Sequence, residues 1–127
     1  MTSCLLSSNE LKPVDFPIII RKGLTFAQPW WFTDMQNNPI PLGGYTAELI
    51  IKRSVNSEDV VLHLTTDNGG GITINKQQGI VNCWLDEEDT AELPVMKGRY
   101  ILKLRSEIGF VARGAGGPVD IVEEVSA

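Results

Sequence analysis

The chain contains few of the residues from which catalytic and metal-binding sites are usually built. One histidine, His63, and two cysteines, Cys4 and Cys83, occur among its 127 residues. A single imidazole limits any Ser–His, Cys–His or multi-histidine metal arrangement, and the two cysteines lack metal-ligand spacing. We expect His63 to face solvent and Cys83 to be a small buried hydrophobe in a reduced, cytosolic environment. The sequence therefore predicts a protein that is not an enzyme and binds no metal or cofactor.

Runs of basic residues and long apolar segments are also missing. Eleven Lys and Arg residues stand against sixteen Asp and Glu residues, which gives a net charge of −5. An acidic surface repels phosphate backbones, so we do not expect a nucleic-acid partner. The apolar stretch at residues 16–20 is far shorter than the roughly 20 residues that span a bilayer. No signal peptide is visible, and we expect no membrane partner.

Short strands with alternating apolar residues dominate what is present. Apolar side chains at every second position predict two half-buried strands. In the first strand these residues are Leu24, Phe26, Trp30 and Phe32, and in the second they are Tyr45, Ala47, Leu49 and Ile51. Similar patterns predict strands at residues 14–21, 24–34, 45–53, 59–65, 72–75, 79–85, 99–106, 109–114 and 119–125. Turn formers separate them, including residues 96–98 and 116–118. This spacing is typical of an all-β sandwich or barrel, and we predict an antiparallel β-sandwich.

The ends and the acidic segment complete this organisation. Residues 1–13 are polar and predict a flexible N-terminal arm, which leaves residues 14–127 as a single β-sandwich domain. Pro17 cannot donate to a ladder, so we place the first strand at a sheet edge. The acidic run Asp86–Asp89 has two interpretations, a Ca²⁺ or Mg²⁺ site and the first turn of one short helix. We favour the helix, because consecutive acidic side chains point in different directions.

A late strand supplies much of the predicted core. We expect six residues to be buried, namely Phe26, Trp30, Leu49, Tyr100, Leu102 and Leu104. Tyr100 follows a glycine at the start of its strand, which is typical of the tyrosine corner of Greek-key sandwiches. In that motif the ring enters the core and the hydroxyl bonds a nearby connection. The alternative is an ordinary strand tyrosine.

Three tryptophans provide the candidate interaction residues. Trp30 and Trp31 are adjacent, so a strand must direct them to opposite faces. If Trp30 is core, Trp31 points outward, and Trp84 is expected to do the same. Exposed aromatic side chains are enriched at protein interfaces. We therefore take Trp31 and Trp84 as interface candidates, and the alternative is that a loop or the N-terminal arm covers them.

The order of these elements resembles small β-sandwich proteins of tailed-phage virions. One matching run is Gly23-Leu24-Thr25-Phe26, followed by Asp34 and by Pro41-Leu42-Gly43-Gly44-Tyr45-Thr46-Ala47. The later matching positions are Gly79, Ile80, Val81, Thr90, Leu93, Gly98, Tyr100, Leu104, Val111, Arg113, Gly117, Val119 and Ile121. The chain departs from the pattern at Asn37-Asn38 and Gly43. The N-terminal domain of phage upper baseplate proteins is one similar member.

This resemblance implies an immunoglobulin-like β-sandwich and a non-enzymatic structural role in a virion, as a tail, baseplate or fibre-adaptor module. The implied partners are other virion structural proteins, contacted in multiple copies. A second function class remains open, a carbohydrate- or receptor-binding module whose exposed tryptophan stacks on sugar. A third, a hydrolase, would require His63 as its base.

Overall fold

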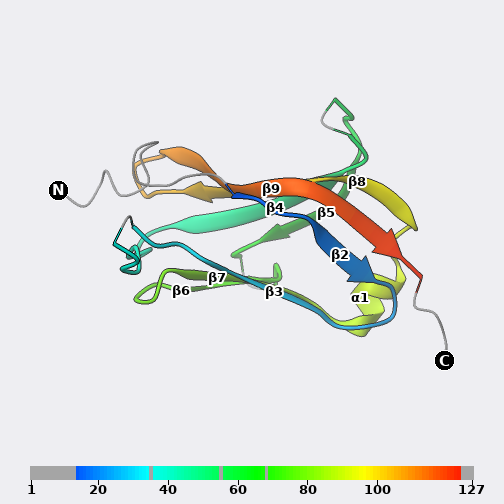
Figure 1. The fold of residues 1–127 in the computed structure, drawn as a ribbon, viewed down its shortest axis with the longest axis horizontal. Helices are drawn as coiled ribbons and strands as arrows, with labels where there is room; N and C mark the ends of the chain where they lie inside the picture. Colours follow the sequence, from blue (N-terminus) through cyan, green and yellow to red (C-terminus); the bar gives the residue numbers. More distant parts are fainter. Residues whose placement is uncertain (1–13, 35, 55, 68, 124–127) are drawn as a thin grey trace.

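The computed structural model describes residues 14–34, 36–54, 56–67 and 69–123, which form two β-sheets packed face to face (Figure 1). The larger sheet contains β1 (Val14–Asp15), β2 (Ile18–Arg21), β4 (Thr46–Lys52), β5 (Val60–Thr65), β8 (Met96–Arg105) and β9 (Val111–Val122). The smaller sheet contains β3 (Phe26–Trp31), β6 (Ile72–Asn75) and β7 (Ile80–Leu85). A single helical turn, α1 (Glu87–Ala91), joins β7 to β8.

The strand order is that of an immunoglobulin-like sandwich. In the large sheet the order is β1-β9-β8-β4-β5, with β2 also paired to β9, and in the small sheet it is β3-β7-β6. Along the chain, the large sheet receives β1 and β2, then β4 and β5, then β8 and β9, while the small sheet receives β3 and later β6 and β7. Such crossing between two sheets is typical of an immunoglobulin domain. Apart from β1 and β2, which run parallel to β9, the strand pairs are antiparallel. The predicted all-β sandwich with one short helix is confirmed.

The core lies between the facing sheets, and alternation in the sequence identifies most of it. All six predicted core residues are buried, with Leu49 and Leu102 fully enclosed and directly opposite each other in β4 and β8. Leu24 is an exception, because it is 44% exposed. It lies in the turn that follows β2, where its amide donates to the Arg21 carbonyl, and β3 begins only at Phe26. The expected alternation therefore starts two residues later than predicted.

Residues 116–118 do not form the predicted turn, because β9 continues through them as one strand. Parallel partners end at Asp15↔Gly116 and resume at Ile18↔Val119, so Gly117 and Pro118 lie beside the break between β1 and β2. Gly117 has φ +149°, and a Cβ there would lie 2.7 Å from the Phe16 carbonyl oxygen. The glycine permits a close approach of two chains. Residues 96–98, also predicted as a turn, open β8.

Tyr100 has some features of a tyrosine corner and some of an ordinary strand tyrosine. Its ring is buried and lies 6.0 Å from the Trp30 ring, between centroids. Its hydroxyl donates to the carbonyl of Phe16, which lies in the connection between β1 and β2. In a tyrosine corner the acceptor lies a few residues upstream, whereas here it is 84 residues away in the chain. The hydroxyl therefore anchors the N-terminal edge of the sandwich.

The acidic run forms the capped helical turn. The Asp86 carboxylate accepts a hydrogen bond from the Asp89 amide at 2.8 Å, as an N-cap residue does. Thr90 is fully buried, and its hydroxyl accepts from the Gly23 amide at 3.0 Å and donates to the Leu24 carbonyl at 2.8 Å. This contact fixes α1 to the turn between β2 and β3. No helix in the described part of the chain is long and apolar enough to cross a membrane.

Candidate functional site

The structure gives the adjacent tryptophans opposite environments. Trp30 is 6% exposed and packs in the core, whereas Trp31 is 63% exposed on the outer face of the small sheet. Trp84 is 56% exposed and belongs to β7, the central strand of the same sheet. The predicted outward orientation of both residues is confirmed, and neither is covered by the described residues.

Pairing between β3 and β7 places both indoles on one surface. Trp84 is opposite Ala27, and Trp31 is opposite Ile80, so these four side chains share the outer face of the small sheet. Ala27 precedes Trp31 by four residues along β3, so the backbone positions of the two tryptophans are about 13 Å apart along the strand direction.

We call this surface the aromatic face, and its outward side chains share the absence of charge. They are Ala27, Pro29 and Trp31 on β3, Ile80, Asn82 and Trp84 on β7, and Thr73 and Asn75 on β6. Burial of these side chains avoids the large cost of removing an ion from water. The composition is that of an interface core, which is depleted in charged residues and enriched in aromatic ones.

The β3 edge of the small sheet is protected against strand addition by Pro29. Within the described residues β3 pairs only with β7, so its other side is a sheet edge. Pro29 lies inside this strand and has no amide proton to donate, which is a common protection of edge strands. Strand β6 forms the other edge of the sheet and contains no proline, so only the β3 edge is protected in this way.

The remaining candidate residues do not converge on a catalytic centre. His63 is exposed on β5, and its Nε2 lies 2.6 Å from the Glu48 Oε2 on the neighbouring strand β4. Cys83 is buried on the inner side of β7, and burial raises the pKa of its thiol to about 12. Among the described residues no group of three or more His, Cys, Asp or Glu side chains could hold a metal ion. Cys4 and the predicted arm at residues 1–13 lie outside the described residues.

Sequence reasoning missed a second surface, on the outer side of the large sheet. Strand β8 directs Lys97, Arg99, Lys103 and Arg105 to that side, at a spacing of two residues interrupted by Ile101. The signal was present as an alternating pattern of basic residues. The overall charge of −5 obscured it, because a net charge says nothing about how the charges are distributed.

Comparison with known proteins adds no assignment of function. No protein-family model matches the chain, and no curated protein matches it. Among solved structures, the extracellular domains 3–5 of Drosophila OTK superimpose with a TM-score of 0.42 at 13% sequence identity. The superposition covers 94% of this chain and 38% of that chain. The immunoglobulin-like fold assigned above rests on the strand order of the chain itself.

Proposed function

We propose that this protein is a non-enzymatic structural module that works through protein–protein contacts made by its aromatic face. The observation that carries the proposal is that two exposed tryptophans, Trp31 and Trp84, lie on one uncharged sheet surface. A tryptophan that becomes fully desolvated in an interface is a typical hot spot, whose truncation costs about 2 kcal/mol or more. The aromatic face offers two such anchors on a rigid scaffold.

The two indoles lie on strands that hydrogen-bond to each other, so the separation of their backbone positions is fixed before any partner binds. Association then orders few additional groups, which lowers the entropic cost of binding. Uncharged neighbours such as Pro29 and Ile80 surround the indoles and can exclude water from them. These properties support a stable contact better than a transient electrostatic encounter.

The finer assignment is an assembly module of a phage virion, as a tail, baseplate or fibre-adaptor component that contacts other virion proteins in multiple copies. The resemblance of the sequence to small virion β-sandwich proteins supports it. Two of the resembling positions, Gly23 and Thr90, meet through a hydrogen bond that joins α1 to the turn before β3. Such positions maintain the scaffold, while the partner is selected by the surface. No cofactor, nucleic acid or membrane is part of this proposal.

The test substitutes Trp31→Ala and Trp84→Ala, singly and together, in the gene that the virus carries. The ratio of variant to wild-type chain in purified particles is then measured by quantitative mass spectrometry. We expect each single variant to remain folded, because both side chains are exposed, and incorporation affinity to fall by about 30-fold for 2 kcal/mol. Ile108→Ala, at a residue 79% exposed in the turn between β8 and β9, is the matched control. Equal incorporation of the double variant and wild type would refute the proposal.

A second candidate function is carbohydrate binding, since an exposed indole can stack on a sugar ring. The observation in its favour is that two indoles on one face, with backbone positions about 13 Å apart along the strand direction, could contact two sugar units of one chain. Glycan-array binding that disappears in Trp31→Ala, together with unchanged incorporation into particles, would favour this candidate over the first.

A further inference from the structure

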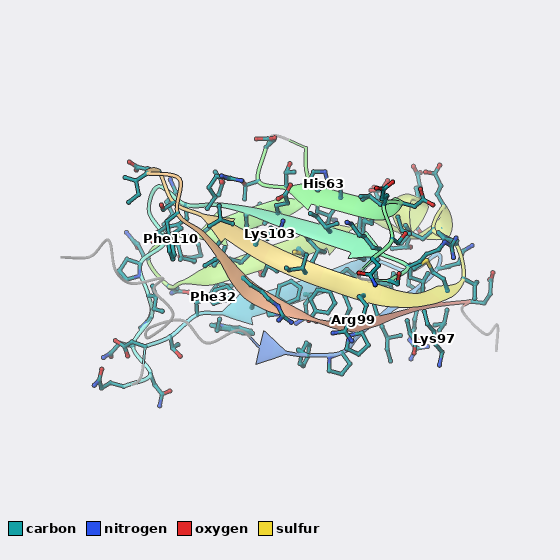
Figure 2. All side chains as sticks on the ribbon, turned by 90° about the horizontal axis from the view of Figure 1, so that it is seen from above. Phe32, His63, Lys97, Arg99, Lys103 and Phe110 are labelled. Atoms are coloured by element: carbon teal, nitrogen blue, oxygen red, sulfur yellow. The ribbon has the colours of Figure 1, made fainter. Side chains whose placement is uncertain are left out.

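Within the described residues the two sheets have four edges, and three of these edges carry features that hinder the addition of another strand. Pro29 lies in β3 and Pro17 lies between β1 and β2, and neither residue can donate a backbone hydrogen bond. The β5 edge, on which Figure 2 shows His63, contains a register shift opposite Ile51 and Lys52. A β-bulge of this kind bends an edge strand away from regular pairing.

Strand β6 forms the fourth edge and has none of these features. Its residues Ile72–Asn75 include no proline and no charged side chain, and their register with β7 is regular. Natural edge strands usually carry such protection, because unpaired backbone groups can bind the edge of another chain. The four residues of β6 make a short edge, so pairing there requires that every free backbone group finds a partner.

The hydrogen bonds of the small sheet determine which backbone groups of β6 point away from β7. The Trp84 amide donates to the Gly71 carbonyl at 2.8 Å, and bonded pairs alternate with non-bonded pairs in an antiparallel ladder. Thr73 and Asn75 therefore bond β7. In a trans peptide the carbonyl and the following amide point in opposite directions. Four groups consequently face the free edge, namely the Ile72 carbonyl, the amide and carbonyl of Ile74, and the Lys76 amide.

Contacts within the domain enclose these four groups at both ends. Strand β5 reaches the start of β6 through the bridge Thr65↔Gly71, and the Leu42 amide donates to the Lys76 carbonyl at 2.9 Å. Between these contacts, no other described strand pairs with the free side of β6. An open hollow follows this part of the strand, and it is lined by Thr73, Ile74, Asn75, Lys76, Gln77 and Asn82. The edge is therefore accessible to a second chain.

The four free groups are complementary to those of a second copy. If two β6 strands run antiparallel with Ile74 opposite Ile74, each Ile74 amide meets the Ile74 carbonyl of the other copy. Each Lys76 amide then meets the Ile72 carbonyl of the other copy, so every free group is used. Moving the register by two residues in either direction places one free amide opposite a carbonyl that is already bonded, that of Gly70 or of Lys76.

We propose that two copies of this chain pair through β6, antiparallel and with Ile74 at the two-fold axis. The contact is isologous and closes as a dimer. The Ile74 side chain, which is half-buried at the margin of the core, would be covered by Ile74 of the second copy. On the outer side Thr73 lies opposite Asn75 of the second copy, so no charges oppose each other.

This pairing joins the two small sheets into one sheet with the strand order β3-β7-β6-β6-β7-β3. Opposed residues of a sheet direct their side chains to the same face. The two aromatic faces therefore become one continuous surface that carries Trp31 and Trp84 of both copies. The contact itself uses neither indole, so its test is independent of the function proposed above.

Sedimentation velocity and amide hydrogen exchange by NMR test the proposal on the complete chain. We expect a reversible dimer whose share rises between about 10 μM and 1 mM, the range of a weak contact. Its affinity should change little between about 0.1 M and 1 M ionic strength, because no charged pair is involved. In the dimer the amides of Ile74 and Lys76 should gain protection. The amides of Thr73 and Asn75, which bond β7, should be protected in both states.

Two matched double variants test the register. Thr73→Lys with Asn75→Asp places opposite charges in both cross-strand pairs, whereas Thr73→Asp with Asn75→Asp places like charges there. Both side chains are exposed, and aspartate keeps the oxygen that accepts from the Gln78 amide. At low ionic strength we expect the first variant to associate about fivefold more tightly than wild type and the second about fivefold more weakly. Both differences should shrink at about 1 M ionic strength.

A third variant removes one of the free amides. Ile74→Pro deletes an amide that does not bond β7, so it should abolish the dimer while the domain stays folded, as β3 does with Pro29. Circular dichroism verifies the fold, and if this variant is unfolded, the two charge variants decide. Trp31→Ala and Ile108→Ala lie outside the contact and should leave association unchanged.

Three results would overturn the proposal. The first is a wild-type chain that stays monomeric at about 1 mM. The second is equal association of the two charge variants at low ionic strength. The third is a dimer in which the Ile74 and Lys76 amides exchange as they do in the monomer, which would assign the contact to another surface.

Discussion

Truncation of Leu102 to alanine measures whether the two sheets face each other as described. Leu102 lies in the middle of β8, is fully buried, and has Leu49 and Ala115 as its opposite residues in β4 and β9. Both neighbouring strands are hydrogen-bonded to β8, so they cannot move inward to fill the space that the missing side chain leaves. A buried Leu→Ala substitution of this kind costs about 2–5 kcal/mol, from lost transfer energy and the remaining cavity.

Urea unfolding followed by tryptophan fluorescence gives the free energy of unfolding for wild type and variant, with the slope against urea expected to be unchanged. Ile108→Ala is the control, because that residue is 79% exposed and should change stability by no more than about 0.5 kcal/mol. A loss for Leu102→Ala as small as that of the control would mean that the inward and outward residues of β8 are exchanged. The outward direction of Lys97, Arg99, Lys103 and Arg105 would then be wrong as well.

Substitutions at three further positions test local features. Thr90→Val should cost about 1–3 kcal/mol in urea unfolding, since it leaves the Gly23 amide and Leu24 carbonyl without their partner, while Thr90→Ser should retain most of the stability. Asp86→Ala should cost about 1 kcal/mol through loss of the N-cap, and no change would show that α1 does not depend on it. Burial raises the pKa of Cys83 from 9.0 to about 12, so the folded protein keeps its thiol proton to higher pH than the unfolded chain does. The resulting stability is present below about pH 9 and is lost as the pH rises toward 12, and Cys83→Ala should weaken that loss in unfolding curves measured across this range.

The alternation of apolar and polar residues along single strands predicted reliably which side chains face the core. It separated Trp30 from Trp31, placed Leu49 and Leu102 in the core, and gave the outward direction of Trp84. It failed where another part of the chain decides the local structure. Leu24 continues the pattern of β3 but is held in a turn, where Thr90, distant in sequence, bonds its carbonyl.

At Gly116 and Gly117, too, a distant part of the chain decides the local structure. A segment rich in glycine followed by proline is typical of a turn, yet here it continues β9 past the break between β1 and β2. Only the parallel pairing with the N-terminal strands explains this, and that pairing leaves no local signal. The aromatic face depends in the same way on strand neighbours such as Trp31 and Ile80, which are far apart in the chain.

Electron cryo-microscopy of purified virions that carry this chain would test most directly whether the aromatic face is an assembly surface. We expect density for the immunoglobulin-like sandwich with Trp31 and Trp84 enclosed by a neighbouring protein, while the turn that contains Ile108 remains free. If the chain is absent from purified virions, or if it is present with both indoles exposed to solvent, the proposed function is wrong.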